Sequence, residues 1–215
     1  MVIFLIFSIP AGALLYFRHM YPGYYEGPEF WRPYLRGIAA FAVSVLPILL
    51  IIDIYPVLYR QGALYTRFFI TDFLLFFIAA LALFFVWERR KISVSYGKPL
   101  FISIAAFFTG YISFIGVFHA VINVSTLNSY NLFAYPVLLL LAFWIASALV
   151  YFFFVTGGWK RYLLLALIAV PPILYSLIPL LQITGFEYYA LACAVLLIVL
   201  SVVLAMFLTK RRLIP

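Results

Sequence analysis

The chain has 215 residues, of which 68% are hydrophobic and only 9% are charged, and its mean hydropathy is +1.20. This composition excludes a soluble globular domain. The formal net charge of +8 lies in short segments between apolar stretches, which is typical of loops at a membrane surface and excludes reading the charge as a nucleic-acid-binding surface.

The charged residues divide the chain into apolar stretches of about the 20 residues that a membrane-spanning helix needs. We therefore predict an all-α integral membrane protein, a polytopic bundle of seven transmembrane helices that forms a single domain over residues 1–215 with no soluble domain. The predicted spans are 2–17, 37–59, 68–87, 100–124, 132–156, 162–182 and 188–209. The first segment is short and is interpreted as an uncleaved anchor; if it does not span, six helices remain.

The segments between the spans carry their own signals. The first, 18–36, is rich in Pro, Gly and aromatic residues, 88–99 is basic, and 125–131 is polar. The last two connections are predicted to be short turns around Gly157, Gly158 and Gly185.

The distribution of basic residues predicts the orientation of the bundle. Twelve of the 14 lysine and arginine residues fall on one side of the predicted spans, and only Arg60 and Arg67 fall on the other. Because basic loops are retained in the cytoplasm, the amino terminus is predicted to lie outside and the carboxyl terminus inside. We expect the cell (cytoplasmic) membrane as the location.

Polar residues inside the predicted spans mark a candidate site. Asp53, Asp72 and His119 each fall within the outer third of a predicted span, roughly 6 to 9 Å below the surface at the rise of an α-helix. An aspartate deep in a span costs roughly 2.5 to 3.5 kcal/mol of insertion free energy, so ionisable groups there are functional candidates.

The candidate outward-facing binding site also includes Asn123, Arg60 and Arg67, which lie nearby in the predicted topology. Ala105, Thr109 and Ile112 fall on the same helical stripe as His119 and Asn123. Helix packing or placement at the membrane interface is the alternative explanation for the whole group, since small and polar residues also mark close helix contacts.

Prolines inside two spans are interpreted as helix breaks or hinges. Pro56 lies three residues after Asp53, and Pro171 and Pro172 are adjacent in the sixth predicted span. A proline removes one helical hydrogen bond and clashes with the preceding turn, so a kink is expected at each place. Discontinuous helices of this kind form binding segments in some transporters.

Motifs for catalysis and for cofactor binding were sought in the sequence and not found. The two histidines, His19 and His119, lie far apart, and Cys193 is the only cysteine. We therefore predict no catalytic residues, no metal, no cofactor and no enzyme activity.

Three functions remain open. The first is a small-solute or ion permease, or the membrane subunit of a transport complex. The second is a seven-helix membrane sensor that signals through a separate partner, and the third is a structural or assembly subunit. The lipid bilayer is the expected surrounding, the basic inner loops are where a partner membrane or cytoplasmic subunit would bind, and no nucleic acid is expected.

Overall fold

The computed structural model describes residues 2–54, 68–94, 97–122 and 129–211. Within these ranges every regular element is helical and no strand occurs, which confirms the all-α class. The elements are α1 (Val2–Met20), α2 (Pro22–Tyr25), α3 (Pro28–Ile54), the π-helical η2 (Phe68–Leu74), α5 (Leu75–Val94), α6 (Lys98–Ile122), α7 (Ser129–Val155), α8 (Lys160–Ile168), α9 (Val170–Ile183) and α10 (Glu187–Lys210).

Several of these helices are long and apolar enough to cross a bilayer. Among the described residues five such segments occur, and they are Pro28–Ile51, Lys98–Ile115, Val137–Val155, Lys160–Ile183 and Glu187–Lys210. A shorter apolar stretch, Leu75–Glu88, overlaps the third predicted span and ends one residue beyond it. The helices are therefore those of a multi-pass membrane protein.

Helix boundaries differ from the predicted ones at the first two connecting segments, 18–36 and 88–99. The helix α3 starts at Pro28, nine residues before the predicted start at residue 37, because a proline is well suited to the first turn of a helix. The segment before it forms the short helix α2, which also starts at a proline, Pro22. At the second connecting segment, α5 continues to Val94, beyond the predicted end at residue 87.

The connection between α9 and α10 is a tight turn at Gly185, whose φ of 82° lies in the left-handed region that glycine adopts without strain. The amide of Phe186 donates to the carbonyl of Leu181 at 2.7 Å, and the amide of Gly185 donates to the carbonyl of Gln182 at 3.1 Å. This pair of bonds closes the end of α9 as a Schellman motif, and it turns the chain directly into α10.

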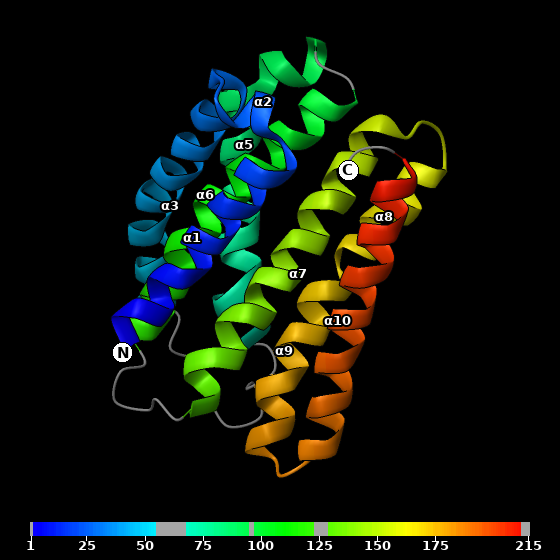
Figure 1. Cartoon of the computed structure of the whole chain (residues 1–215). Helices are drawn as coiled ribbons and strands as arrows, with labels where there is room; N and C mark the ends of the chain where they lie inside the picture. The colour runs from blue at the N-terminus through cyan, green and yellow to red at the C-terminus, as the bar shows by residue number, and fades with distance from the viewer. Residues whose placement is uncertain (1, 55–67, 95–96, 123–128, 212–215) are drawn as a thin grey trace.

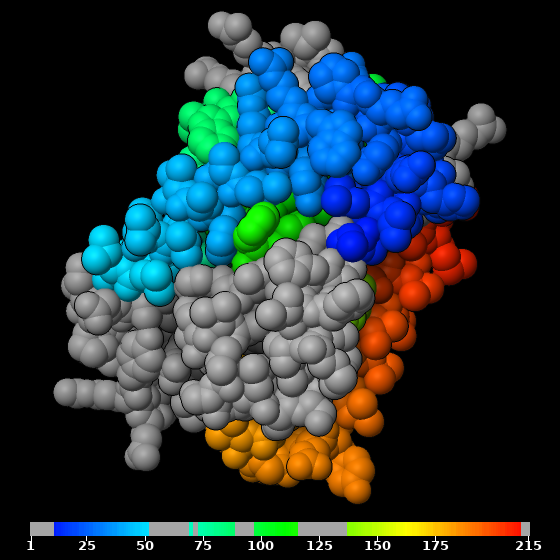
Figure 2. Space-filling model, turned by 60° about the vertical axis from the view of Figure 1, so that its left-hand side comes forward, coloured from blue at the N-terminus to red at the C-terminus, as the bar shows by residue number. Residues whose placement is uncertain are grey.

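Successive long helices run in alternating directions, and α6 lies among its neighbours (Figure 1). The helix α6 packs against α1, α3, α5 and α7. The helices α9 and α10 pack against each other and against α7. Figure 2 shows part of α6, in green, between α1 and α3.

The closest helix contact joins α3 to α6 at two glycines. A Cβ atom added at Gly37 would overlap the carbonyl oxygen of Phe107, and one added at Gly110 would overlap the carbonyl oxygen of Tyr34. Only glycine lets two helix backbones approach this closely, as small residues do at many membrane helix interfaces. The two helices are thus held together backbone against backbone.

Aromatic side chains fill the interior between α5, α6 and α7. Phe73, Phe84 and Phe107 are almost completely buried, and Phe73 lies 4.6 Å from Phe143 of α7 between ring centroids. Phe84 of α5 meets Phe107 of α6 edge to face at 5.2 Å. These contacts tie the third, fourth and fifth predicted spans into one core.

Candidate functional site

The three ionisable residues predicted to share one depth lie on helix segments at the same end of the bundle. Asp53 is the second-last residue of α3, Asp72 lies in η2, and His119 is three residues from the end of α6. The end of α3, the start of η2 and the end of α6 lie opposite the end that holds α2 and the carboxyl terminus (Figure 1).

The rest of the predicted site lies outside the described part of the chain. This applies to Asn123, Arg60, Arg67 and Pro56, and to the side chains of Asp53, Asp72 and His119. The structure thus brings together the helix segments that carry the two aspartates and the histidine. Contact between these side chains stays a prediction.

The segment that carries Asp72 is π-helical. Residues Phe68–Leu74 form this wider helix, which continues directly into α5. Single π-helical turns inside α-helices are rare and occur frequently at functional sites. The sequence FFITDFL contains no glycine or proline, so only the polar pair Thr71–Asp72 distinguishes it from an ordinary apolar helix.

The sixth predicted span is interrupted at Ala169, between α8 and α9. Pro171 and Pro172, both buried, occupy the first turn of α9, and neither can donate a backbone hydrogen bond to the turn before it. The hydroxyl of Ser176 donates to the carbonyl of Pro172 at 2.7 Å. The interruption therefore has two local features: prolines that lack a backbone donor, and a serine hydroxyl that bonds to a backbone carbonyl.

The π-helical segment and the interrupted helix pack against each other. Phe73, the residue after Asp72, lies 6.0 Å from Tyr175 of α9 between ring centroids. Phe73 is completely buried and Tyr175 is nearly so. Two irregular helical segments that are about 100 residues apart in sequence thus meet beside a predicted intramembrane acid.

The opposite end of the bundle holds an ion pair that the sequence analysis did not identify. Arg36 of α3 donates to Glu88 of α5 at 2.5 Å, and the same nitrogen donates to the carbonyl of Trp87 at 2.9 Å. The side chain of Glu88 is fully buried, whereas that of Arg36 is 33% exposed. Glu88 is the first residue of the basic segment 88–99, and the only signal in the sequence is an acid directly before three cations.

Two further contacts organise this end and the interior. The Lys98 ammonium lies 5.2 Å from the ring centroid of Tyr21, and burial, together with the neighbouring Tyr16, raises the pKa of Tyr21, so its hydroxyl stays neutral. Deeper in the bundle, the hydroxyls of Ser44 in α3 and Tyr111 in α6 hydrogen-bond at 2.7 Å. Both Ser44 and Tyr111 are buried.

The described side chains include no group of three or more His, Cys, Asp or Glu residues placed to bind a metal ion. Comparisons with protein-family models, with curated proteins and with solved structures found no match for this chain.

Proposed function

We propose that the protein is a permease for a small cation or a proton-coupled solute, or the membrane subunit of a transport complex. Its substrate enters at the end of the bundle where α3 and α6 end and η2 begins. Asp53 and Asp72 carry the proton or the positive charge, and His119 with Asn123 completes the site.

The observation that carries this proposal is the packing of η2 against α9. A π-helical segment leaves some backbone groups out of the regular hydrogen-bond ladder, and so does a proline-interrupted helix. Irregular backbone is tolerated at membrane depth where it is buried in protein or lines a polar cavity. Here the π-helical segment carries Asp72 and the proline-interrupted helix packs against it. Transporters with discontinuous helices surround their ions in a similar way.

The proposed topology has seven spans, with the amino terminus outside and the carboxyl terminus inside. The arrangement supports it, because eight described cations lie in the helix ends and connections near α2 and the carboxyl terminus (Figure 1). They are Arg18, Arg32, Arg36, Lys98, Lys160, Arg161, Lys210 and Arg211. A reporter active only in the cytoplasm should work when fused at Gly97 or Gly158 and fail at Gly62 or Gly185.

Transport is tested with purified protein in liposomes that contain a trapped pH-sensitive dye. Gradients of H⁺, Na⁺ or K⁺ are imposed in turn, and proton movement is followed in each case. We expect the protein to dissipate at least one gradient, and Asp72→Asn and Asp53→Asn to slow this flux about tenfold or more, because each removes an acid that carries charge.

Glu187→Gln is the matched control for the two aspartate variants. Glu187 lies in the first turn of α10 at the same end of the bundle, and its side chain is exposed. The substitution Glu187→Gln therefore removes one negative charge without changing the proposed site. Equal fluxes in all variants, or no protein-dependent flux at any gradient, would contradict transport of cations and favour the assembly subunit.

A further inference from the structure

A pocket of about 850 Å³ opens between the ends of α7 and α10 and the starts of α6 and α8. It lies at the opposite end of the bundle from Asp72. Its walls are mainly aliphatic and aromatic, with Leu164, Leu204 and Phe207 among them. Its volume is in the range of pockets that hold drug-sized ligands and exceeds what a single inorganic ion needs.

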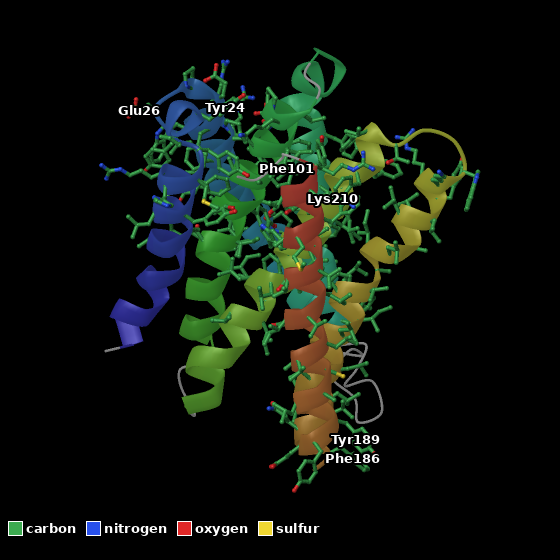
Figure 3. The ribbon with its side chains drawn as sticks, turned by 45° about the vertical axis from the view of Figure 1, so that its right-hand side comes forward. Tyr24, Glu26, Phe101, Phe186, Tyr189 and Lys210 are labelled. Carbon is green, nitrogen blue, oxygen red and sulfur yellow. The ribbon has the colours of Figure 1, made fainter. Side chains whose placement is uncertain are left out.

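The interruption at Ala169 creates this pocket. The helix α9 packs along α10, whereas α8 diverges from it beyond the interruption, as Figure 3 shows beside the labelled Lys210. No residue of α8 is buried. The pocket lies between the two diverging helices, and both α8 and α10 contribute residues to its lining.

Three cations from three different elements line the pocket. They are Lys98 of α6, Lys160 of α8 and Arg211, which follows α10. Among the described residues no carboxylate lines the pocket, and none of the three cations forms an ion pair. The nearest partners of two of them are rings, Tyr21 for Lys98 and Phe207 for Arg211. Within the described part of the chain, no carboxylate therefore compensates the charge of the pocket.

We propose that this pocket binds an anionic phospholipid. Its phosphate lies among Lys98, Lys160 and Arg211, and an acyl chain runs along Leu204 and the neighbouring apolar wall. Basic pockets between membrane helices at the cytoplasmic surface suit anionic headgroups, and in the proposed topology this end is cytoplasmic. Trp159 at the rim is 71% exposed, as an indole at the headgroup level would be.

The binding of phosphatidylglycerol to the full chain in detergent is measured by native mass spectrometry and by thermal stabilisation, with phosphatidylcholine as the neutral lipid. We expect phosphatidylglycerol to bind and stabilise more strongly. The triple variant K98Q/K160Q/R211Q should bind it on the order of 100-fold more weakly, at about 1 kcal/mol per cation near the surface.

The matched control is R18Q/R32Q/K210Q, which removes three exposed cations from the same end without touching the pocket. It should bind phosphatidylglycerol within about threefold of the wild type. Equal losses in both triple variants would overturn the proposal in favour of diffuse surface charge. If the pocket triple variant does not fold, K160Q and R211Q are measured singly, each with an expected loss of about fivefold.

Two further probes separate a lipid from a soluble phosphate. Inorganic phosphate and glycerol phosphate carry the headgroup charge without acyl chains, so they should bind far more weakly than the lipid. If either soluble phosphate bound as tightly as phosphatidylglycerol, the lipid proposal would be wrong and the pocket would be a site for soluble phosphate compounds. Failure of this test leaves the transport proposal intact, because the pocket and Asp72 lie at opposite ends of the bundle.

Discussion

The helices α6 and α10 are both apolar enough to span a bilayer, yet their surroundings are opposite. In the segment Lys98–Ile115 of α6, 78% of the residues are buried inside the protein, compared with 17% in Glu187–Lys210. The more buried helix is the less apolar of the two. Lipid tails are as apolar as leucine, so a helix surrounded by lipid can be apolar on all sides. A helix surrounded by other helices carries small and hydroxyl-bearing residues at its contacts, and these lower its hydropathy.

The largest effect is expected from Gly110→Ala. The new methyl group would overlap the carbonyl oxygen of Tyr34, which is backbone and cannot rotate away, so α3 and α6 would have to separate. We expect a loss of about 4 kcal/mol or more in the free energy of unfolding, seen as a lower melting temperature or as loss of the monodisperse protein in detergent.

The control for Gly110 is Gly12→Ala. Gly12 lies in α1, and a Cβ atom there meets nothing within 4 Å. Alanine favours the helix over glycine by about 1 kcal/mol, so this variant should be as stable as the wild type or more so. Equal destabilisation by the two substitutions would contradict the prediction that the close contact between α3 and α6 stabilises the bundle.

Arg36→Met should have the next largest effect. It leaves the buried Glu88 carboxyl without its guanidinium partner, which costs about 3 kcal/mol for a buried pair. Arg32→Met, one turn earlier and exposed, should have little effect. The double variant R36M/E88L should recover most of the melting temperature, and a double variant no more stable than R36M would argue against the pair as the cause.

The same substitution, valine to alanine, can be made at a buried position and at a lipid-facing position. Val150 in α7 is 2% exposed and Val202 in α10 is 53% exposed. Val150→Ala should lower the free energy of unfolding by about 1 to 2 kcal/mol through a cavity, whereas Val202→Ala should change it by less than about 0.5 kcal/mol. Melting temperatures of the two variants in the same detergent test this, and equal values would contradict a lipid-facing α10.

The smallest decrease in stability is expected from Tyr111→Phe. It removes the hydroxyl that bonds Ser44, and Ser44 keeps a bond to the carbonyl of Phe41 at 3.1 Å. Hydrogen bonds between membrane helices contribute about 0.6 kcal/mol on average, so a small decrease in stability is expected. Tyr162→Phe, at a side chain that is 73% exposed, should have no effect; an equal decrease there would show that the α3–α6 bond contributes nothing.

Sequence predicts the helical elements well because length and apolarity are properties of one segment alone. The break at Pro171 and Pro172 is likewise local. The contacts between helices are not local. In the sequence, nothing distinguishes Gly37 and Gly110 from Gly12 and Gly116, the other glycines inside predicted spans; the contact appears only when α3 and α6 are seen side by side. The pairing of Glu88 with Arg36 was missed for the same reason.

The candidate site shows the same division. Depth along a helix follows from counting residues, so the shared end of the segments that carry Asp53, Asp72 and His119 could be anticipated. The π-helical form of Phe68–Leu74 could not, because its sequence lacks a helix breaker. The packing of that segment against α9 could not be anticipated either, because it joins residues about 100 positions apart in the sequence.

The contact between Gly37 and Gly110 also has a consequence for biosynthesis. The ribosome must add 73 residues between these two positions, which takes about 4 to 15 seconds at ordinary rates of synthesis. During the later part of that interval α3 is complete, but Gly110 and the rest of its contact surface on α6 have not yet been synthesised. A nascent chain arrested shortly before Lys98 should therefore hold α3 against the insertion machinery, and one arrested well beyond Ile122 should release it.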